Sequence, residues 1–201
     1  LHRSLEGMKK SLFVALMLLV ACSREVPVQK QSAVPPPPLS FERPKPAFSY
    51  YEGTYAADAV QQVRAKVGEP FRVLNIHIND DMIRMQVQDP KKPENVDQYT
   101  IDEGKMKDPA PVRLFGDTDQ APLEANVFDP ADVDFTKIAS LIREGDEKIQ
   151  LEGRQISSIS IERNMFDDKR PIMIDVNYRG SRKNGYLRAD RRGGHSEVNI
   201  H

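Results

Sequence analysis

The chain has 201 residues, with 29 basic and 30 acidic side chains and a formal net charge of −1. A balance this close to neutral argues against nucleic acid as a partner, because nucleic-acid-binding domains carry a marked basic excess. The only cysteine, Cys22, has no partner for a disulfide, so the fold must be held together by packing alone.

The N-terminal segment has the features of a secretory signal peptide. Residues 1–7 fit none of its usual regions, whereas Met8 and the two lysines after it look like a start followed by a positive region. An apolar run over residues 12–21 follows and ends with the small residue Ala21. We therefore expect Met8 to be the true start and residues 1–21 to be a signal peptide cleaved after Ala21. A membrane-spanning anchor is the alternative, but ten helical residues rise only about 15 Å, against about 30 Å of hydrocarbon.

The cleavage region also carries a lipidation motif. Its residues Leu19-Val20-Ala21-Cys22 resemble the lipobox of bacterial lipoproteins, in which the cysteine is lipidated and becomes the mature N-terminus. The resemblance implies a diacylglycerol and an N-acyl chain such as palmitate on Cys22, and two or more acyl chains anchor a protein stably to a bilayer. Ser23 follows the cysteine where aspartate would favour inner-membrane retention in enterobacteria. We therefore expect attachment to the outer membrane, facing the periplasm.

Residues 22–47 are expected to form a tether. They show no apolar periodicity and contain four consecutive prolines at 35–38. Such a segment is extended and semi-rigid, at about 3.1 Å per residue, and can hold a domain up to roughly 70 Å from the membrane. A simple linker is the favoured interpretation, and a proline-rich recognition ligand is the alternative.

Residues 48–116 read as a helix followed by strands. An apolar stripe runs through Ala56, Val60, Val63 and Val67, which predicts a helix that Gly68 and Pro70 then end. Alternation predicts strands over residues 74–78, 83–87 and 96–101, a turn at 79–81, a polar loop at 89–95, and a further strand at 112–115.

Residues 129–201 read as a second unit with the same order of elements. Asp129-Pro130 has the form of a helix start, and the stripe Phe135, Ile138 and Ile142 lies 75 residues after Val60, Val63 and Val67. Strands are predicted around residues 159–161, 172–178 and 186–190. Between the two units lies an acidic junction, residues 117–128, whose acidic character continues to residue 134.

The predicted fold is α+β, with two tandem repeats that each pack one helix on an antiparallel meander of three to four strands. Coincidence is the alternative, because the order helix then meander is common. Each unit alone would have a small core, so we expect the two units to pack into one body.

This element order on a secreted chain resembles the PepSY-like domains and the tandem-repeat β-lactamase-inhibitor-protein group. The resemblance covers roughly residues 54–102 and 129–190 and includes the strand ends Tyr99 to Asp102 and Tyr186 to Asp190. It implies an extracytoplasmic protein that binds or inhibits other proteins, often hydrolases. The inhibitors carry disulfides, which this sequence cannot form.

The sequence offers no catalytic, metal or cofactor motif. His77, His195 and His201 have no cysteine partner and no zinc-ligand spacing. The segment Gly193-Gly194-His195-Ser196 is too close to a chain end to favour a catalytic role. We therefore expect no enzyme activity, no metal and no cofactor.

One charged feature stands out, a C-terminal hairpin in which six basic residues lie within a short segment. It is a candidate site for an anionic partner, although it could equally be a solvated hairpin or dock on the acidic junction of the same chain. Its members are Arg179, Arg182, Lys183, Arg188, Arg191 and Arg192.

The leading functional hypothesis is a lipid-anchored periplasmic lipoprotein that binds an envelope protein without catalysis, as an inhibitor, immunity protein or assembly factor. The alternatives are an envelope hydrolase with a dispersed site that uses His77 or His195, and a structural lipoprotein that contacts the cell wall through the basic hairpin.

Overall fold

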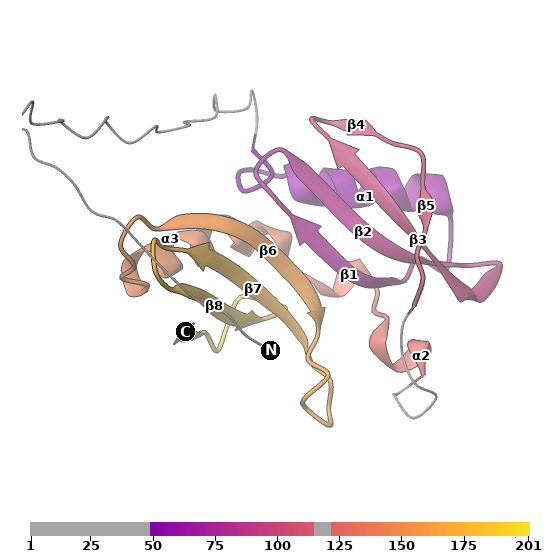
Figure 1. The fold of residues 1–201 in the computed structure, drawn as a ribbon. Helices are drawn as coiled ribbons and strands as arrows, with labels where there is room; N and C mark the ends of the chain where they lie inside the picture. The colour runs from indigo at the N-terminus through magenta and orange to yellow at the C-terminus, as the bar shows by residue number, and fades with distance from the viewer. Residues whose placement is uncertain (1–48, 115–121) are drawn as a thin grey trace, which may run out of the picture. The chain divides into compact units, whose positions relative to one another are not determined.

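The computed structural model describes residues 49–114 and 122–201 of the unit that spans Arg43–His201. Its fold is α+β, a large antiparallel sheet with few helices (Figure 1), which confirms the predicted class. In chain order the elements are α1 (Tyr55–Val67), β1 (Val73–Ile78), β2 (Met82–Asp89), β3 (Lys92–Asp102), β4 (Lys105–Met106), β5 (Ala110–Pro111), α2 (Leu123–Asn126), η1 (Pro130–Asp132), η2 (Phe135–Lys137), α3 (Ile138–Lys148), β6 (Gln155–Arg163), β7 (Ile172–Arg179), β8 (Asn184–Asp190) and β9 (Glu197–Ile200).

Helix α1 forms where the apolar stripe predicts it. Ala56, Ala59, Val60 and Val63 are buried at helical spacing. Gly68 follows the last turn with φ +88°, and its N–H donates to the carbonyl of Arg64. A positive φ is open to glycine at little cost, so this residue ends the helix.

The predicted start of the second helix at Asp129 is wrong. Asp129 accepts a hydrogen bond from the N–H of Ala131, and Asp134 accepts one from the N–H of Thr136, so each caps a separate 3₁₀ turn. Val133 between the two turns has an extended backbone, which interrupts the helix. The α-helix α3 begins only at Ile138.

The late start of α3 also corrects the spacing between the two helices. The buried residues of α3 are Ile138, Leu141 and Gly145. They lie 82 residues after Ala56, Ala59 and Val63 of α1, and not 75 as the sequence pattern indicated.

The strands form one continuous sheet in the order β4-β3-β2-β1-β6-β7-β8-β9, with β5 also paired to β3. The central pairing is β1 with β6, antiparallel, from Asn75 opposite Glu162 to Ile78 opposite Ile159. This seam joins the strands before residue 114 to those after residue 122.

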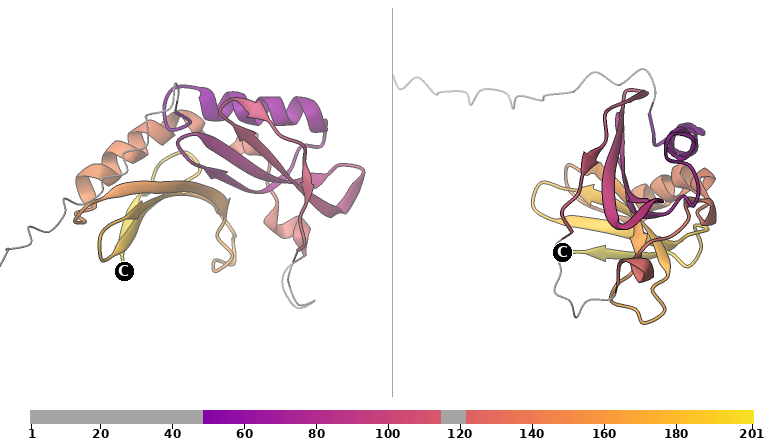
Figure 2. Two further views of the ribbon diagram at one scale, coloured as in Figure 1. Left: turned by 45° about the horizontal axis from the view of Figure 1, so that its top comes forward. Right: turned by 90° about the vertical axis from the view of Figure 1, so that its right-hand side faces the viewer.

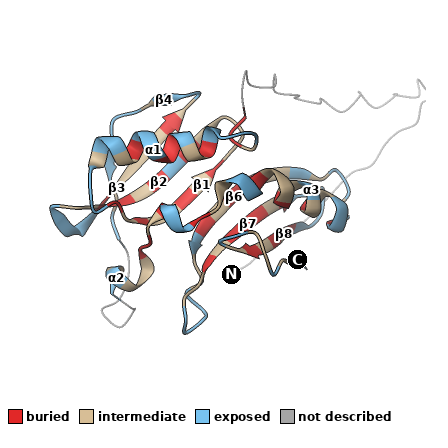
Figure 3. Ribbon diagram, turned by 180° about the vertical axis from the view of Figure 1, so that it is seen from behind, coloured by how far each residue is buried: buried red, intermediate tan, exposed pale blue. Residues whose placement is uncertain are grey.

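Both helices cover the same face of the sheet, because the strand register places the rows of buried apolar side chains on that face. Met85, Ile76, Ile161 and Ile174 stand opposite one another across four strands, and all are fully buried. They form one hydrophobic cluster with the buried residues of α1 and α3. Figure 3 shows this face, with the buried positions of the strands beneath the two helices. Strands β6 to β8 arch, with α3 on the outside of the arch (Figure 2, left).

One strand boundary and two whole strands differ from the sequence prediction. β3 begins at Lys92, within the predicted polar loop, because a tight turn follows β2. The strand predicted at residues 112–115 is replaced by the two-residue β5, with the N–H of Val112 bonded to the carbonyl of Val96; Phe115 lies outside the described residues. The edge strand β9 was not predicted.

Candidate functional site

The helix-free face of the sheet is polar. Side chains alternate between the two faces of a strand, so the neighbours of the buried rows point to the opposite side. Asn75 stands opposite Glu162, and Ser160 stands opposite Asp175, which in turn stands opposite Arg188. These residues gather polar groups from four adjacent strands on the inner side of the arch.

Asp175 and Arg188 form a bidentate ion pair on this face. The Arg188 Nε lies 2.8 Å from Asp175 Oδ1, and its Nη2 lies 2.7 Å from Oδ2. The Asp175 side chain is 12% exposed and the Arg188 side chain 25%. Hydrogen bonding to the carboxylate raises the pKa of Arg188, and the guanidinium also lies 5.2 Å from the ring centroid of Tyr186. The pair is fixed in position and its two charges compensate each other.

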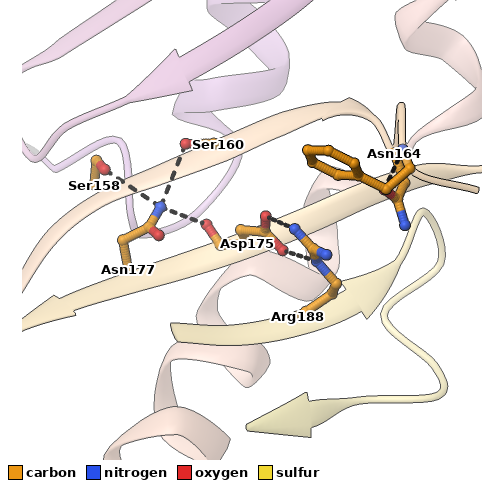
Figure 4. Close-up of polar contacts among 7 residues, drawn as sticks. Ser158, Ser160, Asn164, Asp175, Asn177 and Arg188 are labelled. Carbon is orange, nitrogen blue, oxygen red and sulfur yellow. Dashed lines mark hydrogen bonds and ion pairs between the residues drawn. The ribbon is translucent and has the colours of Figure 1, made fainter. Parts of the chain in front are cut away.

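Asn177 continues the polar surface next to the ion pair. Its Nδ2 lies 3.3 Å from both the Ser160 Oγ and the Asp175 carbonyl, and 3.5 Å from the Ser158 Oγ (Figure 4). These bonds are long, and one amide nitrogen serves three acceptors. The serines and the asparagine therefore hold one another loosely and can change partners when another polar group approaches.

A cavity of about 270 Å³ opens on this face beside the ion pair. Its polar lining includes Glu162, Asp175 and Arg188, and its apolar lining includes Met165, Phe166 and Met173. The cavity therefore combines charged groups with thioether and aromatic surface.

The loop between β6 and β7 forms the outer wall of the cavity. Within it the Asn164 Oδ1 accepts a hydrogen bond of 3.1 Å from the N–H of Phe166. Arg163, at the end of β6, donates through Nε to the Val127 carbonyl and through Nη1 to the Arg170 carbonyl. The base of the loop is thus anchored, while its tip carries Met165, 57% exposed, and Phe166, 98% exposed.

Of the two carboxylates in the cavity lining, Asp175 is paired with Arg188 and Glu162 is not paired; Arg163, which also lines the cavity, is bound to backbone carbonyls. The Glu162 side chain is exposed toward the cavity, and it forms no hydrogen bond or ion pair with the described residues. Partial burial raises the pKa of its carboxyl group, and the negative charge of Asp175 raises it further, with Arg188 opposing. Both effects disfavour the ionised form of Glu162 relative to a glutamate that is free in water.

The predicted basic hairpin does not form one cluster. Arg179, Arg182 and Lys183 are exposed around the turn between β7 and β8. Arg191 and Arg192 lie beyond the other end of β8, whose seven residues extend over about 23 Å.

The two ends of β8 also differ in their surroundings. A hydrogen bond from the Thr136 side chain is the main reason why the pKa of the Asp134 carboxyl is lowered. The positive charge of Arg192 lies close enough to lower that pKa further. The Arg191 carbonyl accepts the N–H of Asp134. This end of the hairpin therefore contacts the segment just after the acidic junction, whereas Arg188, in the middle of β8, is paired with Asp175.

The histidines considered from the sequence lie outside the cavity lining. The His195 side chain is 94% exposed, with Nδ1 3.0 Å from Asp190 Oδ2. His77 is half-buried on β1, and burial, together with the charge of Arg84, lowers its pKa. Ser196 donates its hydroxyl hydrogen to Glu144 rather than to His195. Within residues 49–114 and 122–201, no group of histidine, cysteine and acidic side chains is arranged to hold a metal ion.

Sequence reasoning missed the cavity. Glu162 occupies an ordinary polar position in an alternating strand, and Met165-Phe166 lies between two of the predicted strands. An apolar pair at the centre of a polar turn was the available signal, because turn positions are normally polar and a buried role for both residues is unexpected there.

Several predicted features fall outside the described residues. These are the cleavage residue Ala21, the lipidation residue Cys22, the proline-rich tether, and Asp117 and Asp119 of the acidic junction. Among the helices that are described, none has the length and apolar character needed to cross a membrane.

Comparisons with known proteins support the fold alone. No family model matches the sequence, and no curated protein matches it. The fold is similar to the crystal structure of a predicted lipoprotein from Clostridium difficile 630, with a TM-score of 0.54 and 11% sequence identity. That similarity covers 73% of this chain and 92% of the other.

Proposed function

We propose that the protein is a bacterial lipoprotein, anchored through Cys22 to the outer membrane, that binds an envelope protein in the periplasm without catalysing a reaction. Two independent features support the anchor. The segment ending at Cys22 has the form of a lipobox, and the protein of similar fold is itself a predicted lipoprotein.

The observation that carries the binding role is the loop tip beside the cavity. Phe166 is 98% exposed and Met165 is 57% exposed, on a loop whose base is anchored by Arg163. Burying a phenylalanine side chain in an interface contributes about 1.5–3 kcal/mol, and aromatic anchors dominate the binding energy of many interfaces. An aromatic that contributes nothing to the core is therefore well suited to contact a partner.

The polar residues of the same face favour binding over catalysis. Asp175 is held by Arg188 in a compensated pair, so its carboxylate is not poised to accept a proton from a substrate. His195, the histidine with a carboxylate neighbour, stands exposed on a surface turn away from the cavity lining. A general base acts best where water is excluded, which this turn does not provide.

The two halves of the sheet are, in this proposal, tandem repeats of the kind found in PepSY-like and β-lactamase-inhibitor proteins. Each consists of a helix followed by three antiparallel strands, and the buried helix positions repeat with a spacing of 82 residues. Joining two such units through β1 and β6 gives a wide sheet with both helices on one face. Within residues 49–114 and 122–201, no helix covers the opposite face, which in this proposal is the one that a partner contacts.

Site-specific crosslinking in living cells tests the proposal. A photoreactive p-benzoylphenylalanine at position 166 should capture one dominant envelope protein, whereas the same residue at exposed position 143 on α3 should not. Cys22→Ala serves as the anchor control and should release the protein from the membrane fraction. Equal capture from both positions would argue against a binding role for this face, as would turnover of peptidoglycan, peptides or lipids that a point mutation abolishes.

A further inference from the structure

We infer that the cavity beside Glu162 receives a lysine or arginine side chain presented by the protein partner. The inference rests on the proposed binding function and names the chemistry that the partner must offer. Its basis is the juxtaposition of an unpaired carboxylate with an apolar wall that has no role in the core.

The placement of the charged groups favours a cation beside Glu162. Asp175 and Arg188 neutralise each other at 2.7 and 2.8 Å, which leaves Glu162 and Arg163 as the charged residues of the cavity lining that form no ion pair with the described residues. Arg163 directs its guanidinium at the backbone carbonyls of Val127 and Arg170, and it is absent from the charges that act on Glu162. An anionic ligand would meet the Glu162 carboxylate and would have to displace Asp175 from Arg188, so it is disfavoured.

The size of the cavity favours a side chain over a cofactor or metabolite. Its volume of about 270 Å³ is below the range of roughly 300–1,000 Å³ typical of small-molecule sites. A lysine or arginine has an apolar stem and a charged head, and such residues commonly bury the stem along apolar surface. Met173 and Met165 offer adaptable thioether surface for the stem.

The exposed ring of Phe166 completes the arrangement. It lines the cavity and yet is 98% exposed, so it is free to turn onto a bound side chain without leaving a hole in the core. An aromatic face attracts ammonium and guanidinium groups, most strongly where water is partly excluded. Glu162 and Phe166 therefore provide two independent contacts for one cation.

The test follows the methyl groups of the methionines by nuclear magnetic resonance. The full chain, labelled with ¹³C at the methionine methyls and held in a neutral detergent, is titrated with capped peptides of the form Ala-Ala-X-Ala-Ala. X is lysine, arginine, norleucine or glutamate. Met165 and Met173 report on the cavity, and the buried Met85 of β2 is an internal reference.

We expect saturable shifts of the Met165 and Met173 signals with the lysine and arginine peptides, and none with the norleucine or glutamate peptide. Glu162→Gln should weaken binding about tenfold, as expected for loss of a charged partner, and Phe166→Ala should also weaken it. Glu94→Gln, the same change at an exposed position of β3, should have no effect. Phe166→Ala keeps the test valid even if Glu162→Gln alters the fold, because the Phe166 side chain is 98% exposed and is not part of the core.

Two results would overturn the inference: equal shifts with the norleucine and lysine peptides, or affinities unchanged by both Glu162→Gln and Phe166→Ala. Failure here is distinguishable from failure of the proposed function. A partner captured from position 166 that binds equally well to Glu162→Gln would refute the cation site and leave the binding module in place. Selective binding of the lysine peptide without any captured protein would leave the cation site in place and refute the proposed binding of an envelope protein.

Discussion

Gly145 in α3 gives the sharpest structural prediction, because helix propensity and core packing predict opposite changes in stability when alanine replaces it. Gly145 is buried against Tyr178 of β7, whose side chain is 1% exposed and whose hydroxyl donates to the Ile142 carbonyl at 2.9 Å. A Cβ on residue 145 would lie 2.2 Å from the Tyr178 Oη and 2.8 Å from two ring carbons. Alanine in place of glycine therefore cannot be accommodated without moving the tyrosine.

The expected net effect of Gly145→Ala is a loss of about 3 kcal/mol in the free energy of unfolding. Helix propensity alone would favour alanine by about 1 kcal/mol. Against this, overpacking a core costs about 1–3 kcal/mol, and a displaced tyrosine hydroxyl left without its buried acceptor costs a further 1–3 kcal/mol or so.

Urea unfolding followed by far-ultraviolet circular dichroism measures the effect, since the chain has no tryptophan to report by fluorescence. The denaturant slope should stay unchanged, so that the shift in midpoint reports stability. Tyr178→Phe removes the Tyr178 Oη, the atom nearest to a Cβ at residue 145. In a Tyr178→Phe protein, Gly145→Ala should therefore lower the free energy of unfolding by less than it does in the wild-type protein. An increase in stability for Gly145→Ala would refute the reasoning, because it would mean that Tyr178 does not hold α3 at this point.

Four further predictions concern charged and aromatic side chains described above. Arg188→Ala should lower the free energy of unfolding by about 2 kcal/mol, because it leaves the buried Asp175 carboxylate unpaired; the doubly apolar Asp175→Leu, Arg188→Met variant should recover part of that loss in the same urea assay. Phe166→Ala should leave the thermal midpoint unchanged, since the ring is exposed. Glu162→Gln should raise the thermal midpoint at neutral pH, because burial and the charge of Asp175 raise the pKa of Glu162, and ionisation of Glu162 therefore opposes folding. The difference in thermal midpoint between variant and wild type should vanish as the pH falls below the pKa of Glu162. A difference that persists in acid would contradict this prediction. Hydrogen bonds from His195 and from backbone N–H groups lower the pKa of Asp190 to about 2. The ionised Asp190 should therefore stabilise the β8–β9 turn at pH values above its ordinary pKa near 4, and this stabilisation should be lost as the pH falls toward 2. The amide signals of Gly194 and Arg192 in nuclear magnetic resonance spectra would report the loss.

Local signals in the sequence predicted local structure well. The stripe from Ala56 to Val67 matches α1, and the alternation around Ile76 and Met85 matches β1 and β2. These patterns are reliable because each depends only on which face of a single element meets the core. The same rule identified the α+β class.

Competing local signals explain the main errors. Asp129-Pro130 is a sound capping pattern, but Asp134 provides a second cap five residues later, and the chain uses both to make short turns before α3. The wrong helix start then produced the wrong spacing between the helices. β9 is only four residues long and follows two glycines, so its alternation was too short to identify.

The candidate site was beyond sequence reasoning for a different reason. Glu162, Asp175 and Arg188 come from three strands, and their proximity depends on the register of β6, β7 and β8. A register shift of one residue would move all three to the other face. The sequence identified Arg188 only as part of a basic hairpin, whereas its geometry makes it the partner of Asp175.

The seam between β1 and β6 has a consequence for how the chain folds. Its paired residues, such as Ile76 and Ile161, are far apart in the sequence, whereas β2–β3, β6–β7 and β7–β8 are neighbours in the chain that are joined by loops of eight residues or fewer. Local hairpins form quickly, and non-local pairings must first overcome the entropy of closing a long loop. Each set of strands can therefore take shape early while the edges of β1 and β6 remain unpaired. Until those edges meet, each one is a template for strands of other chains, so the slow step of folding coincides with the period of greatest risk of aggregation.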